Sequence, residues 1–216
     1  MNTLQLQKSI PTTVFTHDQI YTKLAAHVNN INAKISYMVK KGELIRIKQG
    51  VYTFGEDYRR TPIDLLSVAN ILYAPSYVSF DYALSYHGLI PERVYEITSA
   101  TLRAKKLYET PIGRFSYKPI PLKAYALGID WFYDENSGGK LIATPEKALC
   151  DKIRYDRGIG RLSKEKAVDY LEYDLRIEWD MLSKLDVALI HTIADAYKSN
   201  TLHTIATVIS KRSQSA

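Results

Sequence analysis

Residues 30–54 read NINAKISYMVKKGELIRIKQGVYTF and combine a helical repeat with a tight hairpin. Asn30 is a suitable N-cap, and Gly42, after two lysines, is a suitable residue to follow a helix end. The sequence therefore predicts a helix that stops near Lys41, then two short strands joined by a turn at residues 48–50. The apolar residues that recur at helical spacing on one face of this helix are Ile31, Ile35 and Met38.

A helix followed at once by a basic hairpin is the arrangement of winged-helix DNA-binding domains. Upstream, Thr16 and Asp18 begin a second helical pattern that continues to about Ala26, and residues 27–29 form a turn of suitable length between the two helices. We therefore expect a winged helix-turn-helix domain over residues 1–58.

The outer face of the helix after residue 30 is small, polar and basic. Small side chains allow close approach to a DNA groove, asparagine can pair with an adenine edge, and lysine and tyrosine can contact phosphates or bases. An ordinary solvated helix face is the alternative interpretation. The predicted DNA-contacting residues are Asn29, Asn30, Asn32, Ala33, Ser36, Tyr37 and Lys40 of the helix and Arg46, Lys48 and Gln49 of the hairpin.

The distribution of charge favours nucleic acid as a partner of this segment. The whole chain carries 29 basic and 23 acidic residues, but residues 1–60 hold nine of the basic and only four of the acidic ones. The remaining 156 residues are nearly balanced, with 20 basic and 19 acidic residues. A positive excess concentrated on the helix and hairpin is what phosphate binding requires.

Residues 59–216 predict a second domain of mixed α/β type to about residue 157 and helical from there on, so the expected fold class is α+β. Helices are expected over residues 62–73, 79–87 and from Thr144, and strands over residues 93–99, 113–119, 125–132 and 141–143. The single cysteine, Cys150, excludes an intramolecular disulfide and a cysteine-rich zinc site. No segment is apolar for long enough to be a signal peptide or a membrane span, and we expect a cytoplasmic protein.

Three segments resemble the AbiEi antitoxin family in their order along the chain: GELIRIKQGVY at residues 42–52, SYVSFDYALSYHGLIPE at 76–92 and IATPEKALCDKI at 142–153. The resemblance runs from about Phe15 to Arg157. It implies an N-terminal winged helix that represses its own operon by binding inverted repeats. It also implies a second domain that counteracts a nucleotidyltransferase-type toxin, in a type IV pair that needs no stable complex.

The same resemblance suggests a surface that acts on the toxin, although caps or ion pairs are the alternative role for such residues. The expected partners are operator DNA, on which two copies could bind cooperatively, and the toxin; no cofactor, metal or membrane is expected. The residues carried over to this antitoxin surface are Ser79, His87, Glu146, Lys147 and Asp151.

A second positive patch is predicted on or beside the strands of the larger domain, where it could contact flanking DNA or an RNA. Scattered solvated charges are the alternative, because exposed basic residues are common on any protein surface. The residues of this basic patch are Arg103, Lys105, Lys106, Arg114 and Lys118.

The sequence does not favour an enzyme. Ser79 lacks the flanking glycines of a nucleophile elbow, Gly138-Gly139-Lys140 lacks the spacing of a Walker loop, and the paired aspartates of a nucleotidyltransferase are absent. A different class of function stays open: a stand-alone winged-helix regulator whose second domain senses a ligand or a protein. A nucleotidyltransferase-like reading frame beside this one would favour the antitoxin.

Overall fold

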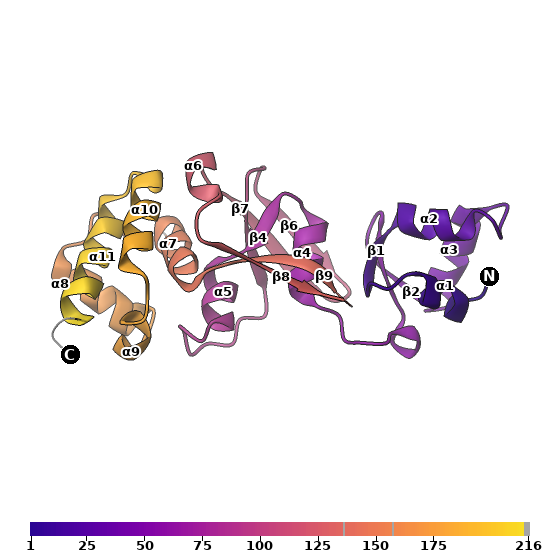
Figure 1. Cartoon of the computed structure of the whole chain (residues 1–216), viewed down its shortest axis with the longest axis horizontal. Coiled ribbons are helices and arrows are strands. Elements are labelled where there is room, and N and C mark those ends of the chain that lie inside the picture. Colours follow the sequence, from indigo (N-terminus) through magenta and orange to yellow (C-terminus); the bar gives the residue numbers. More distant parts are fainter. Residues whose placement is uncertain (136, 157, 214–216) are drawn as a thin grey trace.

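The computed structural model describes residues 1–135, 137–156 and 158–213. It is a mixed α+β fold with two separate sheets, and Figure 1 shows three parts in a row: an N-terminal module, a central sheet with its helices, and a group of C-terminal helices. We call residues 1–58 the N-terminal module and residues 59–213 the second module. Among the described residues, no helix combines the length and the apolar character needed to cross a membrane.

The N-terminal module contains helices packed on a small antiparallel sheet with the strand order β1-β3-β2. The predicted helix after Asn30 and the predicted hairpin are both confirmed, whereas strand β1 was not predicted. A compact apolar cluster that includes Leu24, Ile35 and Phe54 lies between the helices and the sheet. The elements are α1 (Thr3–Ser9), β1 (Val14–Thr16), α2 (His17–Leu24), α3 (Ile31–Lys40), β2 (Leu44–Lys48), β3 (Val51–Phe54) and the 3-10 turn η1 (Glu56–Tyr58).

A mixed sheet of six strands, in the order β6-β7-β5-β4-β9-β8, forms the centre of the second module. The pairs β4–β9 and β5–β7 are parallel, and the other neighbours are antiparallel. The elements are α4 (Leu65–Leu72), β4 (Ser76–Val78), α5 (Phe80–Tyr86), β5 (Ile97–Thr101), β6 (Lys106–Thr110), β7 (Gly113–Pro119), α6 (Leu122–Tyr125), β8 (Ile129–Asp134) and β9 (Gly138–Ala143).

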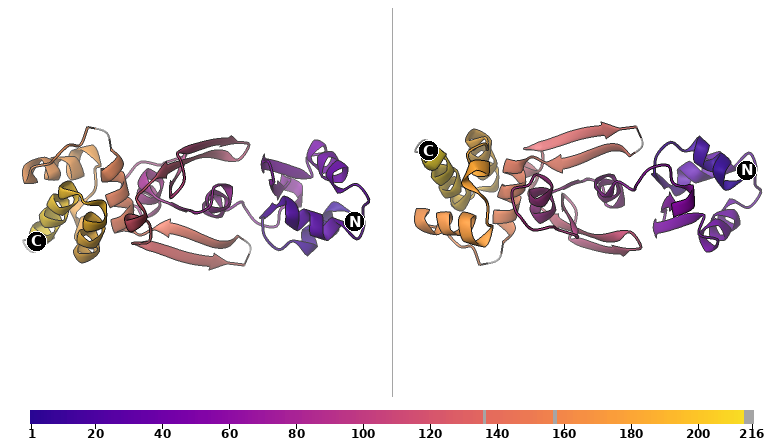
Figure 2. Two further views of the ribbon diagram at one scale, coloured as in Figure 1. Left: turned by 90° about the horizontal axis from the view of Figure 1, so that it is seen from above. Right: turned by 90° about the horizontal axis from the view of Figure 1, so that it is seen from below.

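Helices cover both faces of this sheet. On one face, the Tyr117 hydroxyl donates to the Ala69 carbonyl of α4 at 2.7 Å. On the other face, the Tyr82 amide of α5 donates to the Thr98 hydroxyl of β5 at 3.1 Å, and α7 packs against α5. Figure 2 shows the β6–β7 and β8–β9 hairpins as two arms on opposite sides of α4, both reaching toward the N-terminal module.

The C-terminal helices extend the apolar core of the second module. Helix α10 packs on α7, and α11 packs on both α10 and α8. The predicted helical character after Ser163 is confirmed, with one unpredicted π-helical turn. The elements are α7 (Pro145–Tyr155), α8 (Lys164–Asp169), the π-helical turn η2 (Tyr170–Asp174), α9 (Trp179–Leu182), α10 (Val187–Tyr197) and α11 (Asn200–Ser213).

Several predicted boundaries are wrong, each for a local reason. Helix α4 does not start at Pro62; it starts after Asp64, whose carboxylate caps it by accepting from the Leu66 amide at 2.9 Å. The strand predicted over residues 125–132 is interrupted at Gly128, where φ is +63°, so a short helix precedes β8. The strand predicted over residues 93–99 begins only at Ile97.

The N-terminal sheet faces the second module. Val14, Ile47 and Val51 belong to the same buried cluster as the core of the second module. Helix α3 lies on the far side of the N-terminal sheet in both directions of view (Figures 1 and 2). The sheet is therefore shared between the two modules, and the helix predicted to contact DNA points away from the second module.

Candidate functional site

The outer face of α3 is open to solvent. Ile31, Ile35 and Met38 are buried beneath the helix, as their spacing predicts. Tyr37 lies between two cations, with the Lys34 and Lys41 amino groups 5.4 and 5.9 Å from its ring centre. The predicted DNA-contacting residues that the structure leaves exposed on and before this helix are Asn29, Asn30, Asn32, Ala33, Ser36, Tyr37 and Lys40.

Two of the asparagines already have structural partners. The Asn30 side-chain oxygen accepts from the Ala33 amide at 3.0 Å and caps α3, as predicted. The Asn32 side-chain oxygen lies 3.0 Å from the His17 Nε2 atom and links α3 to the start of α2. Their amide NH2 groups remain available to a partner, because both contacts use the side-chain oxygen.

Lys48, which was predicted to contact DNA, is engaged within the protein in this arrangement of the hairpin. Its amino group donates to the Leu72 carbonyl of α4 and lies 5.1 Å from the Tyr108 ring centre. Burial, followed by the charges of Arg103 and Lys106, lowers the Lys48 pKa. Lys48 is thus part of the junction between the modules.

A β-bulge explains this orientation. Arg46 pairs with Tyr52, and Lys48 pairs with the adjacent residue Val51, so the bulge puts the two cations on opposite faces of the sheet. Arg46 and Gln49 stay exposed. Of the three predicted hairpin contacts, these two remain candidates.

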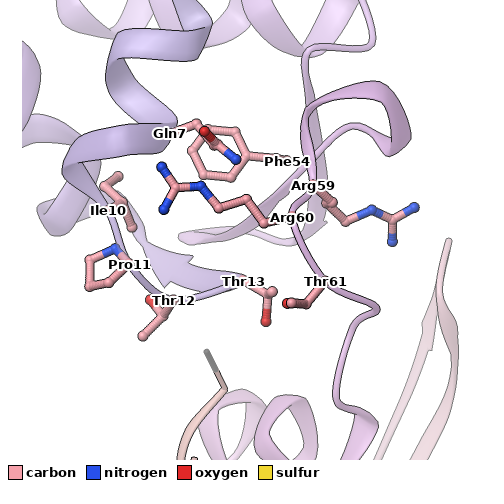
Figure 3. Close-up of a pocket in the computed structure, with 9 residues that line it drawn as sticks. All are labelled: Gln7, Ile10, Pro11, Thr12, Thr13, Phe54, Arg59, Arg60 and Thr61. Carbon is pink, nitrogen blue, oxygen red and sulfur yellow. The ribbon is translucent and has the colours of Figure 1, made fainter. Parts of the chain in front are cut away.

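A narrow crevice lies between α1, β1 and the linker that follows η1 (Figure 3). The Arg60 side chain extends across Gln7 toward Ile10 along this crevice, and Arg59 points away from it. The crevice is occupied by the protein's own arginine, so it is not a candidate ligand site.

The predicted antitoxin surface is wrong, because four of its five residues are inside the protein. Ser79, Lys147 and Asp151 have no exposed area, and Glu146 is buried with its carboxylate accepting from the Asp186 amide at 3.0 Å. His87 is half-buried and its Nε2 atom lies 2.8 Å from the Ala143 carbonyl, to which it donates. Of this group, only His87 is partly exposed, so the five residues do not form a common surface.

These residues instead form a buried polar network around the Asp151 carboxylate. The Lys147 amino group is 2.8 Å from Asp151 Oδ1, and the Tyr197 hydroxyl donates to the same oxygen at 2.5 Å. Asp151 Oδ2 accepts from the Tyr77 hydroxyl at 3.0 Å and from the Ser79 hydroxyl at 2.7 Å. The Ser79 hydroxyl is thus used by Asp151, and it does not cap α5.

The network joins β4, α7 and α10 inside the second module. Burial, followed by the charge of Asp151, raises the pKa of Tyr77 and Tyr197, which keeps both as neutral donors. The backbone at Gly128 approaches so closely that a Cβ there would lie 2.9 Å from Lys147 Cβ. The tyrosines were not predicted as members; the spacing of Lys147 and Asp151 on one helix face was the only available signal.

The predicted basic patch is not one continuous face. Lys106 lies opposite Tyr117 and so projects on the α4 face of the sheet, whereas Arg114 and Lys118 alternate with Tyr117 and project on the other face. Arg103 donates to the Ala74 carbonyl at 3.2 Å, and Arg114 pairs with Glu96 at 3.1 Å. Lys118 is half-buried over the Phe80 ring, and burial lowers its pKa.

Metal binding has no obvious location in the described part of the chain. Over residues 1–135, 137–156 and 158–213, no three histidine, cysteine, aspartate or glutamate side chains converge in a way that could hold an ion. His191 and His203 are in contact through their Nδ1 atoms at 3.0 Å, and His203 Nε2 is 3.0 Å from Asp195. This pair links α10 to α11.

Comparison with known proteins gives a likeness of fold. No protein-family model matches the chain, and no curated protein matches it. The structure is similar to the crystal structure of the RV2827C protein from Mycobacterium tuberculosis, with a TM-score of 0.54 and 17% sequence identity. The match covers 97% of this chain and 79% of that chain. At this identity the similarity concerns the fold alone.

Proposed function

We propose that this protein is a winged-helix DNA-binding repressor of its own operon, and that it acts in the cytoplasm as the antitoxin of an AbiEi-like type IV pair. The exposed face of α3 carries the DNA-binding part of this proposal. The resemblance of three sequence segments to AbiEi antitoxins supports the operator and the toxin as partners.

Helix α3 has the dimensions and the chemistry of a recognition helix. Its diameter with side chains, about 10 to 12 Å, fits the major groove, which is about 12 Å wide, and its ten residues run for about 15 Å. Asn29, Asn32 and Ser36 offer hydrogen-bonding groups for base edges, and Ala33 allows close approach. Because α3 points away from the second module, a duplex can approach it without meeting the β6–β7 and β8–β9 arms.

Cations around this face supply the phosphate contacts. Lys40 and Lys41 lie at the C-terminal end of α3, and Arg46 is exposed on β2 beside it. Lys48 is assigned to the junction because its amino group is engaged by the Leu72 carbonyl. The two lysines at positions 40 and 48 therefore make a matched pair for an experiment.

The test is the salt dependence of binding to a duplex that contains the upstream repeats, measured by fluorescence anisotropy. Lys40→Ala should reduce the slope of log K against log salt by about one unit, because one phosphate contact is lost. Lys48→Ala should leave the slope unchanged. If the intact protein does not prefer the upstream duplex over a scrambled one, the proposal is wrong; if Lys48→Ala lowers the slope as much as Lys40→Ala, the assigned orientation is wrong.

The antitoxin part requires a separate test, because Ser79, Glu146, Lys147 and Asp151 are buried and cannot contact a toxin. The full-length Tyr37→Ala, Lys40→Ala variant should lose operator binding and still rescue growth when co-expressed, from an unrelated promoter, with the adjacent nucleotidyltransferase-like protein. Loss of rescue in this folded variant would instead assign neutralisation to repression. Absence of any such neighbouring reading frame would favour the stand-alone regulator.

A further inference from the structure

Both outer strands of the six-stranded sheet have an open edge. Strand β6 lies at one end of the order and β8 at the other, and neither has a second partner strand in the part of the chain that the structure describes. An open edge presents unpaired backbone N–H and C=O groups and can accept another strand. Edge strands that are protected from pairing with another chain usually carry charged residues or proline in place of large apolar side chains.

Strand β8 exposes three consecutive aromatic side chains on such an edge. Trp131 is 64% exposed, Phe132 is 42% exposed and Tyr133 is 64% exposed. On β6, Leu107 is 43% exposed. Large apolar side chains exposed on two open edges are typical of interaction surfaces.

The β8 edge is acidic and the start of β6 is basic, while Glu109, further along β6, lies opposite Arg114 of β7. Acidic residues lie on and just beyond β8, at Asp130, Asp134 and Glu135, while Lys105 and Lys106 lie at the start of β6. Lys140, the cation on the neighbouring strand β9, is paired with Asp64, and the Asp134 carboxylate accepts from the Ser137 amide and hydroxyl while keeping its negative charge at the end of β8. The β8 edge is therefore complementary to the β6 edge of another copy.

The strand directions fix how two such edges would pair. On one side of β4, strand β9 is parallel to β4 and strand β8 is antiparallel to it. On the other side, strands β5 and β7 are antiparallel to β4, and strand β6 is parallel to it. Strands β6 and β8 thus run in opposite directions. Placing β8 of one copy beside β6 of the next continues the sheet with an antiparallel pair.

The faces of the sheet restrict the register. Asp130, Ile142, Val78, Ser99, Tyr117 and Lys106 are successive cross-strand partners, so they share the α4 face. Among registers that keep this face continuous, one puts Lys106 opposite Asp134, Tyr108 opposite Phe132, and Leu107 opposite Tyr133. A shift by two residues in one direction puts Lys106 opposite Phe132 and Tyr108 opposite Asp130, which loses both the charge pair and the aromatic pair.

We propose that the β8 edge of one copy binds the β6 edge of a second copy, in antiparallel register with Lys106 opposite Asp134 and Leu107 opposite Tyr133. The contact is head-to-tail, so each added copy leaves one β6 edge and one β8 edge free, and the assembly grows as an open chain. A pair of strands this short buries little area, so the association is weak in solution. This inference goes beyond the proposed function and needs no DNA.

The first experiment measures mass by sedimentation velocity from about 1 μM to about 1 mM, the range in which weak protein contacts become populated. Wild-type protein should grow from 24.6 kDa past the mass of a dimer. Two variants should each stay monomeric: Lys106→Glu, which places a carboxylate opposite Asp134, and Phe132→Ser with Tyr133→Ser, which removes the aromatic contacts. Each should weaken self-association by at least about tenfold.

Mixing the two variants isolates the head-to-tail geometry. The Lys106→Glu protein keeps a functional β8 edge and the double serine protein keeps a functional β6 edge, so an equimolar mixture should form dimers and nothing larger. Lys184→Glu, the same charge change at an exposed residue after α9, should associate like wild type. Circular dichroism confirms folding of each variant. A wild-type protein that stays monomeric, or a mixture that stays monomeric, overturns the proposal.

Cysteine pairs test the register. A Leu107→Cys protein mixed with a Tyr133→Cys protein and oxidised should form a disulfide-linked heterodimer, because residues directly opposite in a sheet are close enough to be bridged. Leu107→Cys mixed with Trp131→Cys should react at least tenfold more slowly. Cys150 is fully buried and does not compete. Equal rates for the two mixtures overturn the register, and no cross-link in either mixture overturns the interface.

Discussion

Replacing Asp151 by alanine should strongly destabilise the second module. The carboxylate has no exposed area and receives four donors, at 2.8 Å from Lys147, 2.5 Å from Tyr197, 3.0 Å from Tyr77 and 2.7 Å from Ser79. Its removal leaves the equally buried Lys147 ammonium without a counter-charge. Removing one partner of a buried pair typically costs about 3 to 5 kcal/mol of unfolding free energy. For a module of this size, a loss of about 4 kcal/mol lowers the melting temperature by about 8 to 16 °C.

The assay is urea and thermal unfolding of four proteins that form a double-mutant cycle: wild type, Lys147→Met, Asp151→Ala and the double variant. The double variant should be at least about 1.5 kcal/mol more stable than the sum of the single losses predicts, because it contains no unpaired buried charge. Asp174→Ala, at an exposed aspartate, serves as control and should cost no more than about 0.5 kcal/mol. Additive losses, or a melting temperature of Asp151→Ala within about 3 °C of wild type, would refute the structural role of the network.

Four further substitutions test other parts of the structure. Burial, then the Asp151 charge, raises the pKa of Tyr197 above its usual value of about 10, so its contribution to stability is complete below pH 10 and is lost as pH rises above it. Tyr197→Phe should therefore reduce the alkaline slope of unfolding free energy by about 0.7 kcal/mol per pH unit on average over pH 9 to 11, measured by urea unfolding across that range. Gly55→Ala should cost more than about 2 kcal/mol, because its Cβ would lie 1.9 Å from the Gly42 carbonyl oxygen. At Gly50 the surrounding space is open and only the φ of +81° opposes a side chain, so Gly50→Ala should lower the unfolding free energy by about 1 kcal/mol. Thermal melts in which Gly50→Ala is the more destabilised of the two variants would contradict this packing. The Thr16 hydroxyl caps α2 by accepting from the Gln19 amide, so Thr16→Ala should lower the unfolding free energy by about 1 kcal/mol in the same melts. An unchanged melting temperature would mean that the cap is replaceable.

Local signals were sufficient to predict helices α2 and α3 and the hairpin. Helical spacing identified the buried face of α3, Asn30 was recognisable as a cap, and Gly42 adopts the positive φ that its position after the helix suggested. Each of these features depends on residues within a few positions of one another. Strand β1 was missed because three residues give too short a pattern, and its identity depends on pairing with β3.

The candidate sites were harder to predict because they depend on distant residues. Lys147 and Asp151 have the four-residue spacing of a surface ion pair, and they are buried because Tyr77 and Tyr197 approach from elements 74 and 46 residues away in sequence. The basic patch failed for a related reason: the charges on β6 and β7 divide between two faces according to a register that only the paired strands define. Exposure of a charged residue is thus a property of the tertiary fold.

The junction between the modules determines how the proposed functions can be separated experimentally. Ile47 and Val51 are buried with the core of the second module, while Leu44 and Phe54 of the same two strands are buried in the N-terminal cluster. Because the hairpin thus has a buried side chain on each face, cutting the chain at the linker would expose Ile47 and Val51 on one fragment and leave the Leu72 carbonyl without Lys48 on the other. An inactive fragment of residues 61–216 would therefore not distinguish a missing function from a damaged fold. Tyr37→Ala with Lys40→Ala alters only side chains that are already exposed, so a change in repression or in rescue by this variant reports on the α3 surface itself.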